Sequence, residues 1–320
     1  MDENDVGTEW PALPYEEWRE TRDTLHMYAQ IIGKLRLALS PFEPQWGNVP
    51  FYVTARGLTT SPMPVGTRAL EAEFDLLDHE LVLRTSAGDV QRRPLGGDVA
   101  DFYEDVTRML RAWGIEVSIW PVPTEVSGPI PFVEDHTHTT YNADHAARFF
   151  NVLSHVDLVM KQHRAQFRGR TTPVQFFWGT FDLALIRYSG RAVEPRQGAG
   201  LIERVGGDAE GICAGWWPGD ERTPYPAFFA YAYPAPDGID RISVAPASAA
   251  WNAEVREFLL SYEAVRKARE PRQTILDFFR STYAGAATLL GMDEKLVQVP
   301  TISPSSHHQA PPPPDTNGVA

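Results

Sequence analysis

The sequence is poor in cysteine and in long apolar runs. Among its 320 residues Cys213 is the single cysteine, so no disulfide can form within the chain. No run approaches the roughly 20 apolar residues that a transmembrane helix requires, and the acidic first ten residues lack the apolar segment of a signal peptide. These absences predict a cytoplasmic protein.

Positive charge is also scarce. Lysine and arginine together number 29 against 42 acidic residues, which gives a net charge of −13. Nucleic acids and anionic membranes are bound through clustered basic residues, so we expect neither as a partner. The short motifs of serine hydrolases, dinucleotide-binding folds, zinc proteases and redox-active thiols are missing as well. No cofactor is indicated.

The apolar periodicity predicts an α+β fold, mainly antiparallel sheet covered by helices. Apolar residues at steps of three, four and seven indicate helices, and short runs bounded by turn residues indicate strands. The expected helices are 15–39, 99–113, 143–167, 253–269 and 272–290. The expected strands are 51–58, 69–75, 80–85, 116–120, 212–217, 228–233 and 243–245, and 174–188 is expected as one long strand or a hairpin.

The order of these elements suggests an internal duplication. A helix, several strands and a second helix occur in residues 10–126 and again in 139–292, joined by residues 127–138. A proline precedes a strand in each half, at Pro50 and Pro173. The same order can also arise by chance in an α+β protein. Residues 297–320 are rich in proline and serine, which predicts a disordered tail.

One apolar segment, 174–191, contains charged residues that stand out. Asp182 and Arg187 interrupt a run of aliphatic and aromatic side chains that includes Trp178. Because a buried charge is costly unless it is paired, Asp182 is a candidate acid, base or ligand anchor. Arg187 and Trp178 are candidate binding residues. The alternative is a structural role, although a separation of five places Asp182 and Arg187 on opposite faces of a regular strand.

The segment 134–141, EDHTHTTY, concentrates side chains that bind protons or metals. In an extended chain Glu134, His136 and His138 would share one face, which is compatible with a zinc or iron site. No second group with ligand spacing accompanies them. A polar loop between the halves is therefore favoured, and no metal centre is predicted.

Two of the four lysines, Lys34 and Lys161, lie late in the first helix of each half. Lysine is a compact charge with an adjustable pKa, so the pair could anchor an anion, and Lys161 could act in catalysis. The alternative is two solvated lysines. Arg168 opens the basic stretch 168–172, which could hold a carboxylate or phosphate or form a solvated turn. The expected partner is thus an anionic small molecule.

Several stretches resemble an uncharacterised bacterial family of about 300 residues, a domain of unknown function. They are WPALPYEEW (10–18), PFYVTARGLTTSPMP (50–64), PVQFFWGTFDLALIRYSGR (173–191), GWWPGD (215–220) and FFAYAYP (228–234). The resemblance implies no substrate, cofactor or catalytic residue. It implies a pattern Asp-x-x-His-x-x-Tyr, which corresponds here to Asp135, His138 and Tyr141.

The leading functional hypothesis is a small-molecule-binding protein or enzyme with a polar cleft between the halves. Asp182, His138 and Lys161 are the candidate catalytic residues. The hypothesis predicts that one concavity collects Asp182, Arg187, His138, Tyr141, Lys161 and Arg168. The competing hypothesis is a non-catalytic interaction protein, which would expose an apolar patch built from the aromatics at 216–217 or 231–233.

Overall fold

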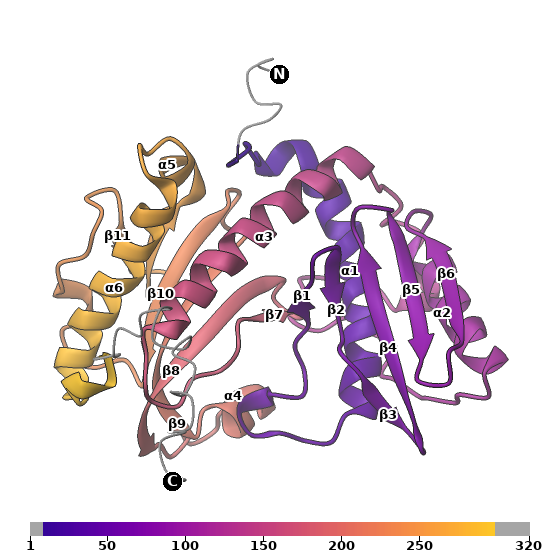
Figure 1. Ribbon diagram of the computed structural model, residues 1–320, viewed down its shortest axis with the longest axis horizontal. Helices are drawn as coiled ribbons and strands as arrows, with labels where there is room; N and C mark the ends of the chain where they lie inside the picture. The colour runs from indigo at the N-terminus through magenta and orange to yellow at the C-terminus, as the bar shows by residue number, and fades with distance from the viewer. Residues whose placement is uncertain (1–8, 298–320) are drawn as a thin grey trace, which may run out of the picture.

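The structure, a computed structural model, describes residues 9–297 as two antiparallel sheets flanked by helices (Figure 1). The α+β class expected from the sequence is confirmed. The predicted disordered tail lies, from residue 298 onward, outside the described residues. Within residues 9–297, no helix is both long and apolar enough to cross a membrane.

The first half begins with the long helix α1, Tyr15–Leu39. Its bounds are those that the apolar stripe predicts, and it ends because Pro41 cannot continue the helical hydrogen bonding. Most of its residues from Thr21 onward are buried, because both halves of the molecule pack against it. The buried residues of α1 include polar and charged ones, among them Arg22, His26 and Gln30.

The first sheet has six strands in the order β1-β2-β4-β5-β6, with β3 paired to β4. Helix α2, Val99–Ala112, follows, and the Asp98 side chain caps it by accepting a hydrogen bond from the Asp101 amide. The strands are β1 Tyr52–Val53, β2 Gly57–Thr59, β3 Met63–Val65, β4 Arg68–Asp75, β5 Glu80–Thr85 and β6 Val90–Pro94. A short 3-10 helix, η2 Pro44–Trp46, follows α1, and another, η3 Phe132–Glu134, lies between α2 and the second half. A third, η5 Glu294–Val297, follows the last α-helix that the structure describes.

The second half repeats the order with helix α3, Ala143–Ala165, and a six-stranded sheet in the order β11-β12-β10-β9-β8-β7. Asn142 caps α3 through the His145 amide. The strands are β7 Gln175–Phe177, β8 Asp182–Ala192, β9 Ala209–Trp217, β10 Ala227–Tyr233, β11 Ala250–Asn252 and β12 Glu257–Ser261. The remaining helices are α4 Leu201–Gly206, η4 Ile239–Arg241, α5 Tyr262–Arg266 and α6 Pro271–Leu290.

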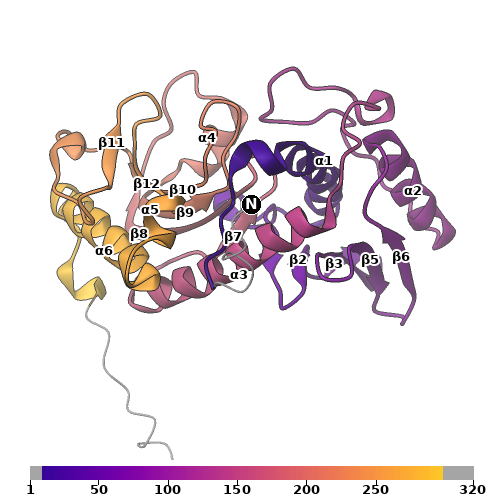
Figure 2. The same ribbon diagram turned by 90° about the horizontal axis from the view of Figure 1, so that it is seen from above.

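The two sheets meet through the first strand region of each half. Phe51 and Phe176 exchange two backbone hydrogen bonds of 2.8 Å in an antiparallel bridge. In the view from above, α3 and α6 lie along one side of the second sheet, whereas α1 and α2 lie on the opposite side of the first (Figure 2). Internal duplication stays a prediction.

The core sits where α1 and α3 pack against the second sheet. Phe149 of α3 stacks on Trp18 of α1 with ring centroids 5.1 Å apart, and on Trp216 of β9 at 6.1 Å. Trp216 and Phe149 have no exposed surface. Burial of large aromatic side chains of this kind contributes several kcal/mol each, on the order of 3–5 when truncation is the measure.

The sequence-based prediction of a helix over 253–269 is wrong. Residues Glu257–Ser261 form β12, which pairs with β10, and only Tyr262–Arg266 are helical, with Ser261 as the cap. Tertiary pairing overrides the helical periodicity there. The predicted strands at 116–120 and 243–245 do not form either, because neither segment has a neighbouring strand.

Candidate functional site

One face of the second sheet carries polar groups and is not covered by α3 or α6. Alternation along β8 directs Leu183 and Leu185 toward the main core, and Asp182 and Ala184 to the other face. On β9, Gly215 leaves room for the Phe229 ring, since a Cβ there would lie 2.2 Å from it. This face of the sheet therefore carries both small and aromatic side chains beside Asp182.

This face forms the floor of a cleft of about 420 Å³. Helix α1 and the segment 125–130 supply one wall, and the β9–β10 and β11–β12 turns supply the other. The polar and aromatic residues that line the cleft include Arg22, Asp23, His26, Glu125, His138, Thr180, Asp182, Trp217, Asp220, Glu221, Arg222, Phe229, Tyr231 and Glu257. Because α1 belongs to the first half, the cleft lies between the halves.

The positive charges in the cleft already have carboxylate partners. Arg22 is paired with Asp23 at 2.9 Å between Nη1 and Oδ1, and its guanidinium lies over the Phe181 ring. Arg222 lies 3.6 Å from a carboxylate oxygen of Asp220. Both arginines are therefore neutralised locally, and neither is paired with the carboxylates on the sheet.

Besides the exposed Glu221, three carboxylates of the cleft make no ion pair among the described residues. They are Glu125, Asp182 and Glu257. Asp182 accepts a hydrogen bond from the hydroxyl of Thr180, while Glu257 and Glu125 make no hydrogen bond within residues 9–297. A charge in a site of low polarity is costly unless it is paired. These three carboxylates therefore lack the positive charge that would balance them.

The surroundings hold these carboxyls toward their protonated form. Burial, with a smaller contribution from Glu125, raises the pKa of Asp182 to about 7. Burial and the charge of Asp182 raise the pKa of Glu257 to about 7, and loss of hydration also raises the pKa of Glu125. Near neutral pH each sheet carboxyl is thus poised between charged and neutral states.

Helix α1 fixes the floor and one wall of the cleft through two side chains. His26 donates from Nε2 to the carbonyl oxygens of Trp178 and Gly179, both at 3.0 Å. Burial, with Arg22 adding to it, lowers the pKa of His26 to about 3, so the ring stays neutral. Gln30 donates to the Thr124 carbonyl at 2.8 Å and accepts from the Thr124 amide at 3.1 Å.

Glu125 is held in a conformation that aims its carboxylate at the hairpin turn before β8. Its φ of 60° is unusual for a residue other than glycine. A Cβ on Gly179 would lie 2.1 Å from Oε2 of Glu125, so a larger residue there would displace the Glu125 carboxylate. A strained residue held by its neighbours is frequent at binding sites.

His138 lines the cleft, and the buried carboxylate of Asp135 holds its ring in place. Asp135 has no exposed surface and accepts from Nδ1 of His138 at 2.7 Å, and from the amides of Thr137 and His138 at 3.1 Å. The hydrogen bond to Asp135 outweighs burial and raises the pKa of His138. Burial alone would raise the pKa of Asp135, but the hydrogen bonds from His138 and the backbone lower it. His138 is thereby oriented and favoured as a cation.

The comparison with protein families is decisive for the identity of the chain. A family of unknown function, DUF5996, matches residues 10–299. The chain belongs to the DUF5996 family. No curated protein and no solved structure matches it. The resemblance found in the sequence is thus confirmed, and the function has to be inferred from the geometry of the DUF5996 chain itself.

The DUF5996 structure brings two of the six expected lining residues together. Asp182 and His138 both line the cleft, with the Asp135 partner beneath His138. Arg187 lies on the opposite face of the sheet, as its spacing from Asp182 predicts. The expectation that all six converge is therefore not met.

The other candidates of the DUF5996 chain lie outside the cleft. Tyr141 shares a 2.9 Å hydrogen bond with His79, and Lys161 donates to Asp157 on the outer side of α3. The Arg168 amide donates to the Leu296 carbonyl, and its side chain is exposed. These positions correct the hypothesis for Tyr141, Lys161 and Arg168, because the helix and loop that carry them face away from the cleft.

Lys34 and Trp178 pack against each other inside the protein. The ammonium of Lys34 lies 5.8 Å from the Trp178 ring centroid, and burial lowers its pKa. Lys34 is only 6% exposed, so the alternative of a solvated lysine is wrong for it. The Trp178 ring rests on Gly33 and donates to the Val49 carbonyl, so both residues support the cleft floor from behind.

The expected aromatic patch is not formed as the competing hypothesis described it. Trp216 has no exposed surface and belongs to the core. Trp217 and Tyr231 are partly buried and line the cleft. Of the aromatic residues in the expected patch, Trp216 thus belongs to the core and Trp217 and Tyr231 belong to the cleft, whereas Tyr233 lies against Gly207.

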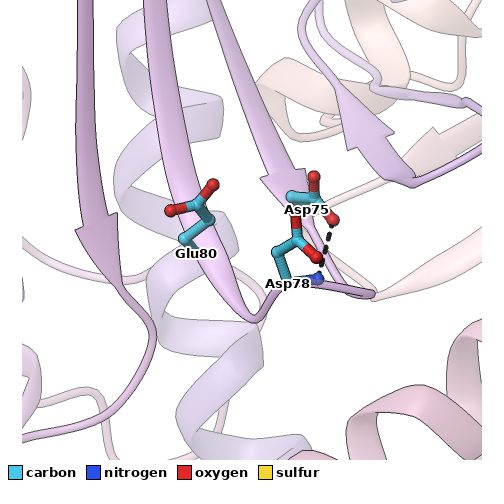
Figure 3. A group of neighbouring side chains, drawn as sticks. All are labelled: Asp75, Asp78 and Glu80. Carbon is cyan, nitrogen blue, oxygen red and sulfur yellow. Dashed lines mark hydrogen bonds between the residues drawn. The ribbon is translucent and has the colours of Figure 1, made fainter.

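An acidic group at the end of the first sheet is balanced internally. Asp75, Asp78 and Glu80 place one carboxylate oxygen each within 4.8 Å of one another, at the turn between β4 and β5 (Figure 3). Arg56 bridges Asp75 and Asp78, and Arg92 pairs with Glu80. Among the described residues, Glu134, His136 and His138 do not form a comparable group, since His136 pairs with Asp98.

The sequence reasoning missed Glu257 and Glu125. Glu257 was assigned to a helix, and Glu125 belongs to the segment between the halves. The run EFLLS after an Asn-containing turn is compatible with a strand, and this signal would have placed Glu257 on a sheet face.

Proposed function

We propose that the chain is a cytoplasmic small-molecule-binding protein whose cleft takes an organic cation carrying ammonium groups. The observation that carries the proposal is the set of carboxylates, Asp182, Glu257 and Glu125, that have no basic partner in residues 9–297 although both cleft arginines are paired. An ammonium ligand would supply the missing positive charge. This reverses the sequence-based expectation of an anionic ligand for the cleft.

The aromatic residues beside the carboxylates support the same ligand class. Trp217, Phe229 and Tyr231 line the cleft on the strands next to Asp182 and Glu257. Aromatic faces attract ammonium groups through their electron-rich centres and also bury methylene groups. A cleft of about 420 Å³ suits a ligand of metabolite size.

The test is calorimetric titration of the full chain with the diamine cadaverine, with pentane-1,5-diol as its neutral counterpart. We expect cadaverine to bind and the diol to bind at least about tenfold more weakly, because it lacks the charge. Glu257→Gln should weaken cadaverine binding by about tenfold or more. Glu254→Gln is the matched control, because Glu254 is exposed and does not line the cleft. Equal binding of diamine and diol, or an unchanged Glu257→Gln variant, would refute the proposal.

A second candidate function is acid–base catalysis on the bound molecule. It is favoured by the Asp135–His138 pair, which presents an oriented histidine to the same cleft as Asp182. A group that titrates near the working pH is an effective proton donor or acceptor. If the protein is an enzyme, His138→Gln should abolish turnover while cadaverine affinity falls little. Loss of affinity without any detectable turnover of amines would support binding alone.

A further inference from the structure

A second cavity lies on the opposite face of the second sheet, where α3 and α6 end. Its volume is about 670 Å³, and it is separate from the cleft because the sheet lies between them. Arg187 of β8 reaches it between the helices. The other lining residues are Gln166, Arg280, Tyr283, Ala284, Ala287, Thr288, Gly291, Met292, Asp293, Glu294 and Val297.

Arg187 brings a buried positive charge to this cavity without an acidic partner. The residue is 2% exposed, and its Nη2 donates to the His163 carbonyl. Its Nε atom is buried and has no hydrogen-bond partner among the described residues. The guanidinium lies between the rings of Tyr283 and Phe167, at 4.8 and 5.2 Å from their centroids. Such a charge is costly unless an anion meets it.

The charge of a second arginine, Arg280, also acts on Arg187. Burial, with a smaller contribution from the charge of Arg280, lowers the pKa of Arg187 to about 10, while the Tyr283 hydroxyl acts in the opposite direction. Arg280 donates to Gln166 at 3.1 Å and lies 3.8 Å from Asp277. The carboxylates of Asp293 and Glu294 stand at the exposed rim and do not contribute to the pKa of Arg187.

The part of the wall that α6 and the following turn supply beside Arg187 is largely apolar. Ala284, Ala287 and Met292 come from α6 and the turn that follows it, and Met292 is 8% exposed. An inorganic ion would leave these surfaces in contact with water. A ligand with an apolar body and one anionic end would cover them and also meet the guanidinium groups.

We infer that this cavity is a binding site for an organic carboxylate. The carboxylate lies against Arg187 and Arg280, and the apolar body packs along α6 toward Met292. The anionic partner expected from the sequence, with Arg187 as a binding residue, thus has its place here and not in the cleft. The inference is independent of the cation proposed for the cleft.

The experiment is titration of the full chain with hexanoate and with hexanamide, which has nearly the same shape and no charge. Hexanoate should bind with one site per chain and at least about tenfold more tightly than hexanamide, because a charge-assisted pair is lost with the amide. Arg280→Gln should weaken hexanoate binding by about tenfold. Arg272→Gln, at an exposed position on the same helix, is the matched control and should change nothing.

Arg187→Met tests the central residue, with circular dichroism to confirm folding. A folded variant should lose hexanoate binding but keep binding cadaverine in the cleft. If the variant does not fold, the hexanamide comparison and Arg280→Gln decide the matter. Equal affinities for hexanoate and hexanamide, no binding of either, or an unaffected Arg280→Gln variant would overturn the inference.

Discussion

The two faces of strand β8 differ in the charge that each leaves without a partner. On one face Asp182 lies in a cleft with other carboxylates, and on the other Arg187 lies in a cavity with a second arginine. They are only five positions apart in the sequence, yet the sheet lies between them. Elsewhere the buried carboxylates of Asp135 and Asp75 are matched by His138 and Arg56. The comparison teaches that one strand separates two unmatched charges of opposite sign, each in a cavity where a ligand can complete it.

We expect the largest change in the free energy of unfolding at one of the two neighbouring tryptophans on opposite faces of β9. Trp216→Ala should lower the free energy of unfolding by about 3–5 kcal/mol, because it removes a fully buried ring that stacks on Phe149. Trp217→Ala should cost only about 1 kcal/mol, because that ring is partly exposed in the cleft. Urea denaturation measures both, and equal costs would contradict the distinction between a core face and a ligand face.

Removing a matched charge should be costly. Asp135→Asn should lower the free energy of unfolding by about 2 kcal/mol, because a carboxylate with no exposed surface loses charge-assisted hydrogen bonds. The native pKa of Asp135 is lowered, so this contribution is present at neutral pH and is lost as the pH falls through that pKa.

The same variant has a second readout at His138. Its pKa, raised in the native chain by Asp135, should fall toward the ordinary value of 6.5, as followed by NMR titration. The stabilisation from His138 is full below 6.5 and is lost as the pH rises through the raised pKa, so Asp135→Asn should flatten this dependence. An unchanged histidine titration would show that the pair is not coupled.

Removing an unmatched charge should instead stabilise the protein. Asp182→Asn should raise the free energy of unfolding by about 1–2 kcal/mol at pH 8. The native pKa of about 7 lies above the ordinary 3.8, so the native chain holds its proton longer and loses stability between these values as the pH rises. The gain should therefore vanish below pH 3.8. Denaturation at pH 3.5, 6 and 8 measures it, and a loss of stability at pH 8 would mean that Asp182 has a partner after all.

We expect the smallest change in stability at Arg187, on the face of β8 opposite the cleft. Arg187→Met keeps a long flexible side chain in place of the guanidinium and removes a buried charge, while it loses one hydrogen bond to His163 and the contacts with two rings. These terms offset each other, so stability should change by less than about 1 kcal/mol. Thermal denaturation measures the change, and a loss of several kcal/mol would indicate that Arg187 is a structural residue.

The sequence predicts elements well where local signals agree. The helix Tyr15–Leu39 has a continuous apolar stripe and ends before Pro41, so periodicity and chain geometry point to the same bounds. The run at 257–261 fits a helix and a strand equally, and only its pairing with β10 decides for the strand. Short apolar runs are ambiguous because both periods fit them.

The candidate site could be predicted only where its chemistry interrupts an apolar or distinctive segment. Asp182 and His138 were found in this way. Glu257 and Glu125 look like ordinary surface residues in the sequence, and the sheet register and the turn at Glu125 bring them to the cleft. The scarcity of lysine singles out Lys161 in the sequence, but scarcity does not predict the direction of its side chain on α3.

The hydrogen bonds from His26 and Gln30 have a consequence for how the chain can be divided. One helical turn of α1 binds the backbone at Thr124 and at Gly179, two points that are 55 positions apart in the sequence. A fragment that starts at residue 139 would keep the six-stranded floor but lose the helix that anchors its hairpin. The two halves are therefore joined at the cleft, and complementation between separately produced fragments would have to rebuild these anchors.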